Sequence, residues 1–344
     1  MALTTQTHSV VYIKTTETCN LNCSHCFTSG MNGRKIYFDH VKTANWCNEL
    51  DTGDNLIHLE YHGGEPMLAP MADLREFHDI TKAQWGDRAT HGITTNLVFK
   101  LTEEKLAFFD EVITGGNIGT SWDPNIRFTN EHQRKMWENN VKHLTSLGHS
   151  LKCFISVSKD VIKLQPIDIA DYMHSLGIRE ISYERLTHDG NATINTDIFP
   201  HNKDLDDWWM LMHEQTENHP VENGFMQSVY EKFSAGQFRI GTFCRDCEQK
   251  IHTINADGTV AGCPNTAPTM HYGHIDTPAK EVRLSPKRME IISCEQHERD
   301  PRCYSCPVFM YCHSDCHQLV WMDDVCPAPK SLMLKLAEEK NWIS

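Results

Sequence analysis

Residues 19–26 of this sequence read CNLNCSHC, which places Cys19, Cys23 and Cys26 at the spacing C-x3-C-x2-C. The motif directly follows residues 10–16, an apolar, β-branched run that predicts a strand. Three thiolates on one short loop can ligate three irons of a 4Fe–4S cubane and leave the fourth iron open to another ligand. A zinc site is the alternative, and it needs a fourth Cys or His, for which His25 lies inside the tight loop.

The alternation of strand and helix patterns extends outward from this motif over residues 10–200. Apolar runs predict strands at 10–16, 56–61, 91–97, 118–122, 151–157 and 180–186. Helical periodicity predicts helices at 41–50, 71–84, 103–109, 131–147 and 166–176. Because strands that alternate with helices form parallel βα units, we expect an α/β fold, a partial (βα)6 barrel. It is two units short of the closed eight-stranded barrel.

The composition of the sequence changes near residue 241, after which cysteine, glycine and proline are frequent and long segments with helical or strand periodicity are absent. Residues 204–234 predict two helices before this point, and a last helix is predicted from about 329 to 341. We therefore expect a barrel core at 1–203, a helical linker at 204–240, a small cysteine-rich domain at 241–328 and a C-terminal helix at 329–344.

The fourteen cysteines and the charge limit the class of protein. Reducing conditions inside cells disfavour structural disulfides, so clustered cysteines indicate metal or cluster ligation. The formal net charge of −14 disfavours non-specific binding to nucleic acid, although a local basic groove is compatible with it, and it favours a basic partner. No long apolar run predicts a membrane span, and residues 1–9 lack the apolar core of a signal peptide. We expect a cytoplasmic protein.

Short motifs follow the second, third and fourth predicted strands. They read HGGEP at 62–66, Thr-Thr-Asn at 94–96 and Ser-Trp-Asp-Pro at 121–124, with Arg134 thirteen residues past Ser121. With CNLNCSHC, this order of motifs resembles the radical S-adenosylmethionine (SAM) superfamily, whose relatives carry GGEP, a Thr-Asn pair and Ser-x-Asp-Gly there. Pro124 stands where relatives carry glycine, so we expect a different turn. The active edge of such a sheet is its carboxyl side, where all these motifs fall.

The resemblance implies a cofactor and its contacts. Cys19, Cys23 and Cys26 would hold a 4Fe–4S cluster whose open iron binds the amino and carboxylate groups of SAM. An electron from the cluster would then cleave the sulfonium and leave a 5′-deoxyadenosyl radical. The residues that the resemblance places against SAM are Gly63, Gly64, Glu65, Pro66, Asn96, Ser121 and Arg134.

A second cysteine array occupies the C-terminal third. It reads C-x2-C-x5-C-x3-C from Cys303, and Cys244 precedes Gly258 and Cys263 at the spacing C-x13-G-x4-C. This array resembles the SPASM domain of many radical SAM enzymes, and the resemblance implies two auxiliary 4Fe–4S clusters. The ligands implied for the first are Cys244, Cys247, Cys263 and Cys316. Those implied for the second are Cys303, Cys306, Cys312 and Cys326. A pair of zinc ribbons is the alternative.

The resemblance to anaerobic sulfatase-maturating and peptide-modifying enzymes implies an oxidoreductase or maturase. Such an enzyme abstracts hydrogen from an unactivated carbon of a peptide or protein side chain and makes a crosslink or an oxidised residue. It would take electrons from a donor such as flavodoxin or ferredoxin. In sulfatase-maturating relatives, the cysteine at the position of Cys263 is directly followed by an Asp that serves as the general base. Pro264 and Asn265 stand here instead, so we do not expect that route, and the general base is not predicted.

Two other functions stay open at this point. The first is a radical isomerase that rearranges a small molecule or a hypermodified nucleobase, as in thymidine hypermodification of phage DNA. It is favoured by a first strand preceded by only about ten residues, which leads us to expect no N-terminal peptide-recognition domain. The second is a non-catalytic iron–sulfur electron carrier or structural zinc protein. Glu184 and Arg185 end the sixth predicted strand, where they would contact substrate or SAM or form an ion pair.

Overall fold

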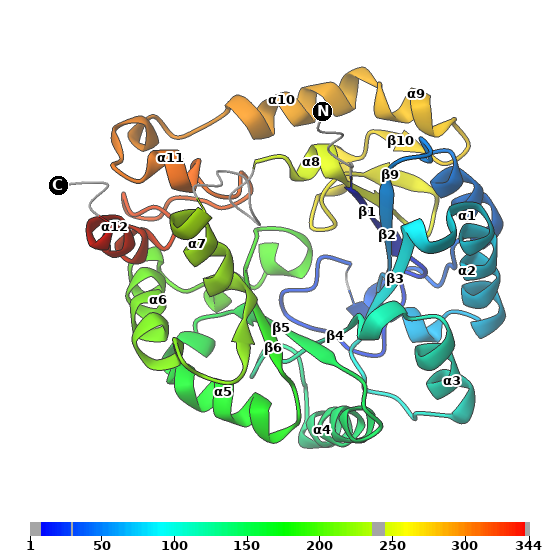
Figure 1. Ribbon diagram of the computed structural model, residues 1–344, viewed down its shortest axis with the longest axis horizontal. Helices are drawn as coiled ribbons and strands as arrows, with labels where there is room; N and C mark the ends of the chain where they lie inside the picture. Colours follow the sequence, from blue (N-terminus) through cyan, green and yellow to red (C-terminus); the bar gives the residue numbers. More distant parts are fainter. Residues whose placement is uncertain (1–7, 29, 236–244, 341–344) are drawn as a thin grey trace.

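The computed structural model describes residues 8–28, 30–235 and 245–340. Its centre is one curved sheet of ten strands in the order β10-β9-β8-β1-β2-β3-β4-β5-β6-β7 (Figure 1). The six predicted strands are present and pair in parallel, each with the next along the chain. They are β1 (His8–Lys14), β2 (Leu56–His62), β3 (Ala89–Thr94), β4 (Ile118–Ser121), β5 (Leu151–Val157) and β6 (Glu180–Arg185). The predicted partial (βα)6 barrel is confirmed.

Helices cover the outer face of this sheet in chain order (Figure 1). They are α1 (His40–Asn48), α2 (Met71–Trp85), α3 (Glu103–Glu111), α4 (Glu131–Ser146), α5 (Pro166–Ser175) and α6 (Asn202–Thr216). In α2 the buried residues Leu74, Phe77, Thr81 and Trp85 recur every three or four positions, which puts them on one face. The side chain of Asn130 caps α4 by accepting a hydrogen bond from the backbone N–H of Gln133.

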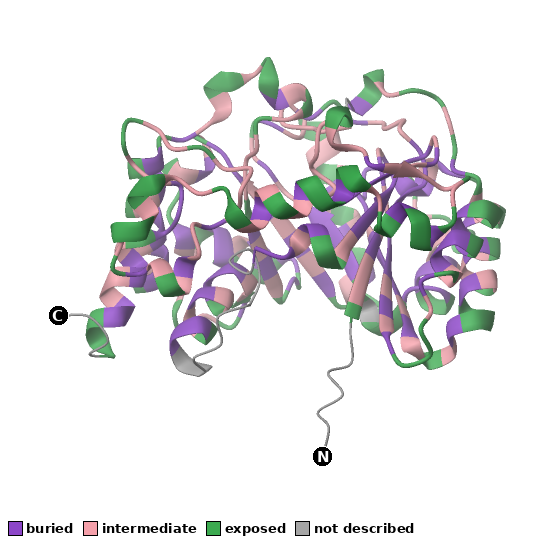
Figure 2. Cartoon of the chain, turned by 90° about the horizontal axis from the view of Figure 1, so that it is seen from above, coloured by how far each residue is buried: buried purple, intermediate pink, exposed green. Residues whose placement is uncertain are grey.

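The two faces of the strands differ in chemistry. Successive side chains of a strand point to opposite faces, and in β5 the residues at 151, 153, 155 and 157 are fully buried while those between them are not. Figure 2 shows buried residues along the strands and exposed ones on the outer surfaces of the helices. The other face of β6 carries Glu180, Ser182 and Glu184, so the concave face of this strand is polar.

The sheet continues into the cysteine-rich segment. After α7 (Gly224–Ala235) and α8 (Cys247–Lys250), strand β8 (Ile251–Ile254) pairs in parallel with β1. Strands β9 (Thr259–Ala261) and β10 (Gly273–His274) extend this edge antiparallel, and β7 (Glu222–Asn223) extends the other edge beside β6. These strands are only two to four residues long and were not predicted from the sequence. The division at 203, 240 and 328 stays a prediction.

The last part of the chain passes from the β10 edge back to the β6 edge (Figure 1). It contains α9 (Ala279–Arg283), α10 (Pro286–His297), α11 (Phe309–Cys312) and α12 (Lys330–Glu339), and α12 packs against α6 and α7. Helix α10 was not among the predicted helices. Its buried face includes Arg288 and Glu295, so an apolar period is missing there. In the described ranges, no helix has the length and apolar character needed to cross a bilayer.

Candidate active site

One cavity of about 260 Å³ opens at the carboxyl edge of the parallel strands. The loop that follows β1 contributes Cys19, Cys23 and Cys26 to its lining. The ends of the other strands contribute residues 62–64, 94–96, 121, 156 and 184–187, and the cysteine-rich segment contributes Pro264 and Asn265. Residues from six strand ends and from a segment distant in sequence therefore meet in one space.

The cysteine loop is held by hydrogen bonds to its sulfur and backbone atoms. The backbone N–H of Leu21 lies 3.4 Å from Cys19 Sγ, and Asn96 Nδ2 lies 3.6 Å from the same sulfur. Burial raises the pKa of Cys19 to about 12, with the charge of Glu65 adding to the effect, and burial raises the pKa of Cys23 to about 11. These thiols are therefore protonated at neutral pH unless a positively charged centre favours their thiolates.

The donor set fits a cluster better than a single ion. The loop contributes three cysteine sulfurs to the lining of the cavity, and His25 is the other metal-binding side chain that it contributes. In the described part of the chain, no group of three or more His, Cys, Asp or Glu side chains is close enough to hold one metal ion. The cysteines instead border a space, which is what a cubane of several atoms requires.

The two glycines of HGGEP allow the end of β2 to approach the backbone before the cysteine loop. A Cβ on Gly63 would lie 2.4 Å from Thr16 O, and one on Gly64 would lie 2.0 Å from Thr18 O. The backbone N–H of Gly64 donates to Thr16 O at 2.8 Å. Both glycines line the cavity. Because they have no side chain, the two glycines let the backbone of the cysteine loop lie close to the end of β2. Their own backbone atoms stay accessible to a ligand in the cavity.

Glu65 and Pro66 do not line the cavity. The fully buried Glu65 carboxylate accepts hydrogen bonds from Thr95 Oγ1 and Asn96 N, both at 2.7 Å, and from Met67 N at 3.0 Å. Pro66 begins the short 3-10 helix Pro66–Leu68. Asn96 does line the cavity, so Glu65 acts in this structure by holding Asn96 in place.

The structure does not bring Arg134 to the cavity. Arg134 lies on the outer helix α4, where Glu131 and Glu138 pair with its guanidinium. Arg127 lines the cavity instead, and it was not predicted from the sequence. Arg127 Nε donates to Asp123 Oδ2 at 2.5 Å. Its signal in the sequence was its position four residues after the aspartate of Ser-Trp-Asp-Pro.

Asp123 organises this side of the cavity from a fully buried position. Besides Arg127, its carboxylate accepts a hydrogen bond from Ser156 N at 2.5 Å and lies 3.5 Å from His25 Nε2. Burial lowers the pKa of His25 to about 4, and burial with the charge of Lys14 lowers the pKa of His62 to about 3. Both lining imidazoles are therefore neutral at pH 7.

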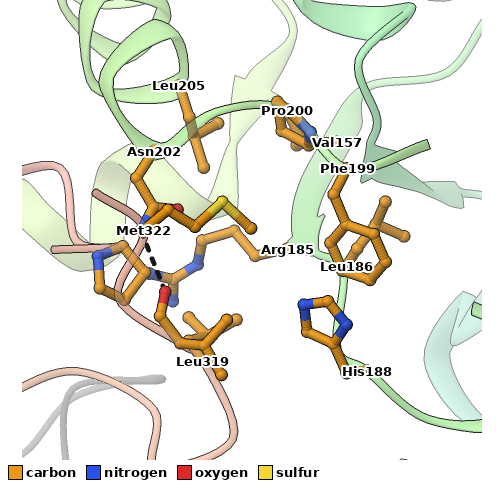
Figure 3. A pocket seen from close by; sticks show the side chains of 12 residues that line it. Val157, Arg185, Leu186, His188, Phe199, Pro200, Asn202, Leu205, Leu319 and Met322 are labelled. Atoms are coloured by element: carbon orange, nitrogen blue, oxygen red, sulfur yellow. Dashed lines mark hydrogen bonds between the residues drawn. The ribbon is translucent and has the colours of Figure 1, made fainter. Parts of the chain in front are cut away.

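Arg185 joins the barrel to the cysteine-rich segment. Its guanidinium forms a two-pronged ion pair with the buried Asp315, with Nη2 to Oδ1 at 2.8 Å. Asp315 follows His313 and Ser314 between two cysteines, and all three have positive φ. Figure 3 shows the Arg185 side chain extending across a small pocket between β6, the start of α6 and residues 319–322. Arg185 borders this pocket and the main cavity.

The cysteines predicted for the second auxiliary cluster surround one space. Cys303, Cys306, Cys312 and Cys326 all line a cavity of about 280 Å³ between α11 and α12. Pro327 lines this cavity and also the small pocket beside Arg185. The structure therefore brings together four cysteines that the sequence spreads over residues 303–326.

The first predicted auxiliary set is partly described. Cys244 lies outside the described residues. Burial, and more weakly the charge of Cys316, raises the pKa of Cys263. The buried Glu295 carboxylate accepts a hydrogen bond from the backbone N–H of Cys247 at 3.0 Å.

Known structures share this architecture. No family model matches the chain. The structure of anSMEcpe, an anaerobic sulfatase-maturating enzyme, with bound AdoMet and the Cp18Cys peptide, is similar with a TM-score of 0.77 at 17% identity, over 97% of each chain. SuiB of Streptococcus suis bound to the precursor peptide SuiA is similar with a TM-score of 0.62 at 13% identity, over 94% of this chain and 76% of that one.

One curated relative matches a short part of the sequence. An uncharacterized protein of Methanocaldococcus jannaschii is 38% identical over 56 residues, which is 16% of this chain and 19% of that protein. The two structural matches, by contrast, cover both the barrel and the cysteine-rich segment.

Proposed function

We propose that this chain, which has the fold of the radical SAM enzymes anSME and SuiB, is itself a radical SAM enzyme that modifies a peptide or protein side chain. One observation carries the proposal. Cys19, Cys23 and Cys26 share a single cavity with the strand-end residues that the sequence motifs mark. When bound there, a 4Fe–4S cluster and SAM supply a 5′-deoxyadenosyl radical able to abstract hydrogen from an unactivated carbon.

The chain's own residues would hold and orient these groups. The three cysteines of the loop would hold the cluster, and Gly63 and Gly64 would offer backbone to the SAM amino group. Arg127 presents a positive charge fixed by Asp123, so we propose Arg127 for the SAM carboxylate in place of Arg134. Asn96 and Ser121 supply further polar atoms on the same wall.

We propose two auxiliary clusters in the C-terminal third. The shared cavity of Cys303, Cys306, Cys312 and Cys326 supports the second cluster. The first would use Cys244, Cys247, Cys263 and Cys316. Such clusters could accept the electron left on the substrate after hydrogen abstraction, as an oxidoreductase or maturase requires. A peptide substrate is supported by the bound peptides that the anSMEcpe and SuiB structures contain.

The test is anaerobic reconstitution of the chain with iron and sulfide. We expect about twelve irons and about twelve sulfides per chain, the content of three clusters. With a reductant such as dithionite or reduced flavodoxin, the enzyme should convert SAM to 5′-deoxyadenosine, measured by liquid chromatography and mass spectrometry. Stoichiometric zinc without sulfide, or a loaded protein that forms no 5′-deoxyadenosine, would contradict the proposal.

The reaction type is tested by the product. Candidate precursor peptides should lose about 2 Da, because a crosslink or an oxidation removes two hydrogens. A product of unchanged mass, or modification of a nucleoside with no change in any peptide, would instead favour the isomerase.

A further inference from the structure

Glu184 occupies an unusual position in the cavity. It is the last residue of the concave face of β6, above Ser182 and Glu180, and its neighbour Arg185 points to the cysteine-rich segment. The Glu184 side chain is accessible to solvent within the cavity that it lines. Protein nevertheless surrounds it closely, and burial raises the pKa of its carboxyl group.

The other charges on the cavity wall are already compensated. Arg127 is paired with Asp123, and Arg185 is paired with Asp315. Among the described residues that line the cavity, Glu184 is the one carboxylate. The hydrogen bond that the structure shows for it comes from Ser182 Oγ at 3.2 Å, a weak and neutral partner for a charged group. A ligand that fills the cavity would displace the water around this carboxylate, and a cationic ligand would compensate its charge.

Burial raises the pKa of Glu184 more than the charges of Arg185 and Lys152 lower it. Tyr12 lines the same cavity, and its pKa is raised by burial and by the charges of Glu60 and Glu184. Its hydroxyl therefore stays neutral. Lys152, the nearest lysine on β5, is paired with Glu180 at 2.5 Å. The nearby cations are thus committed to other carboxylates, while Glu184 faces open space.

We propose that Glu184 forms a subsite for a cationic group of the substrate, a lysine-type ammonium or an arginine-type guanidinium. The subsite deepens the proposed function and rests on it, since the ligand is the side chain of a peptide. Glu184 acts there as a specificity-determining residue, and Tyr12 and Asn265 are neutral polar residues of the same cavity. The acidic net charge of the chain suits the approach of such a peptide.

The experiment measures peptide selectivity on the reconstituted enzyme with SAM bound. Two libraries of heptapeptides are used, both N-acetylated and C-amidated, with randomised flanking residues. One library has lysine at its central position, and the other has norleucine there. We expect the wild type to bind the lysine library about tenfold more tightly, a typical gain from a well-placed charge pair. Glu184→Gln should bring the two affinities to within about twofold.

Three further variants make the result specific. Glu184→Asp should keep part of the lysine preference, and Glu184→Lys should shift preference to a library with central glutamate. Glu214→Gln is the control, because Glu214 is exposed on α6 and does not line the cavity, and it should keep the wild-type ratio.

Other outcomes overturn the proposal. One is a wild type that binds both libraries equally or binds neither. Another is a Glu184→Gln variant whose affinity for SAM alone falls by the factor lost on peptide, which would make Glu184 a SAM contact. Failure of the proposed function is distinct, since it appears as an absence of 5′-deoxyadenosine from the wild type.

Discussion

The two cysteine regions of this chain are held in different ways. Residues 19–26 follow a seven-residue strand and rest on the ends of its neighbours, with glycine contacts to the backbone and an Asn96 contact to sulfur. The cysteines at 303–326 lie on short helices and loops, where three successive residues have positive φ. Regular structure thus supports the first region, whereas a buried ion pair, and the clusters we propose, support the second.

This difference teaches where each region obtains its stability. The first loop is attached to the ten-stranded sheet and to the hydrophobic core that packs on it. The second has little regular structure of its own, so Arg185 and metal binding should contribute more of its folding free energy. The following predictions test this contrast, from the largest expected effect to the smallest.

Cys19→Ala should abolish 5′-deoxyadenosine formation and remove about four of about twelve irons. Its far-UV circular dichroism and melting temperature should stay near those of the wild type, because the barrel does not depend on this loop. Cys312→Ala should also lose about four irons, and in addition expose residues 300–330 to limited proteolysis. Equal protease resistance of the two variants would contradict the contrast.

Arg185→Met leaves the buried Asp315 carboxylate without its partner. Removing one member of a buried pair costs about 3–5 kcal/mol, so chemical denaturation of the variant should show a large loss of stability. Iron content in the C-terminal third, measured by metal analysis on a Cys19→Ala background, should fall as well.

Arg134→Met is the matched control for this arginine. Its ion pairs with Glu131 and Glu138 lie at the surface of α4, and such pairs contribute little. A stability loss as large as that of Arg185→Met would show that burial is not the cause.

Gly64→Ala should disturb the first region from within its support. The added Cβ would lie 2.0 Å from Thr18 O, and moving the backbone to relieve this overlap should cost about 3 kcal/mol. Gly53→Ala is the control, because only its positive φ opposes a side chain and the expected cost is about 1 kcal/mol. Thermal denaturation measures both, and a smaller loss for Gly64→Ala would mean that the loop adapts.

The lysine preference should fall as pH falls. Above the pKa of Glu184 the carboxylate is charged and attracts a cation, and below it this attraction is lost. Since burial raises that pKa, the loss should come at a higher pH than for an ordinary carboxyl group. The charged groups facing Glu184, Arg185 and Lys152, are paired with Asp315 and Glu180.

Binding of the two libraries measured from about pH 8 to about pH 5 tests this expectation. The pKa of His25 is lowered to about 4 and that of His62 to about 3, so both imidazoles stay neutral over this range. In Glu184→Gln, the ratio of the affinities for the lysine and norleucine libraries should not change with pH. A ratio that still depends on pH in this variant would assign the effect to another group.

Much of the barrel could be predicted, because its elements are long and periodic. Strand 151–157 was predicted with its observed bounds, and α2 and α4 differ from prediction by one residue. The short strands β8 and β9 were missed, since three or four residues carry too little pattern. Helix α10 was missed because its buried face includes charged residues.

The candidate site was predicted unevenly for a similar reason. The cysteine loop, Gly63, Gly64, Asn96 and Ser121 do meet in one cavity, as motifs at strand ends must in a parallel sheet. Glu65 and Arg134 lie elsewhere, because the direction of a side chain depends on the hydrogen-bond partners that surround it. Arg127 stands four residues after Asp123 in the sequence, and the structure shows that the buried Asp123 carboxylate accepts its hydrogen bond.

By itself, the sequence determined the order of strands and helices and the grouping of the cysteines, since both arise from spacings of a few residues along the chain. Only the tertiary structure decided which residues face the same space. The ion pair of Arg185 and Asp315 joins residues 130 positions apart, and β8 lies beside β1 across more than 200 residues. Such contacts depend on packing and burial in three dimensions, and they make Glu184 the one carboxylate among the described residues that line the cavity.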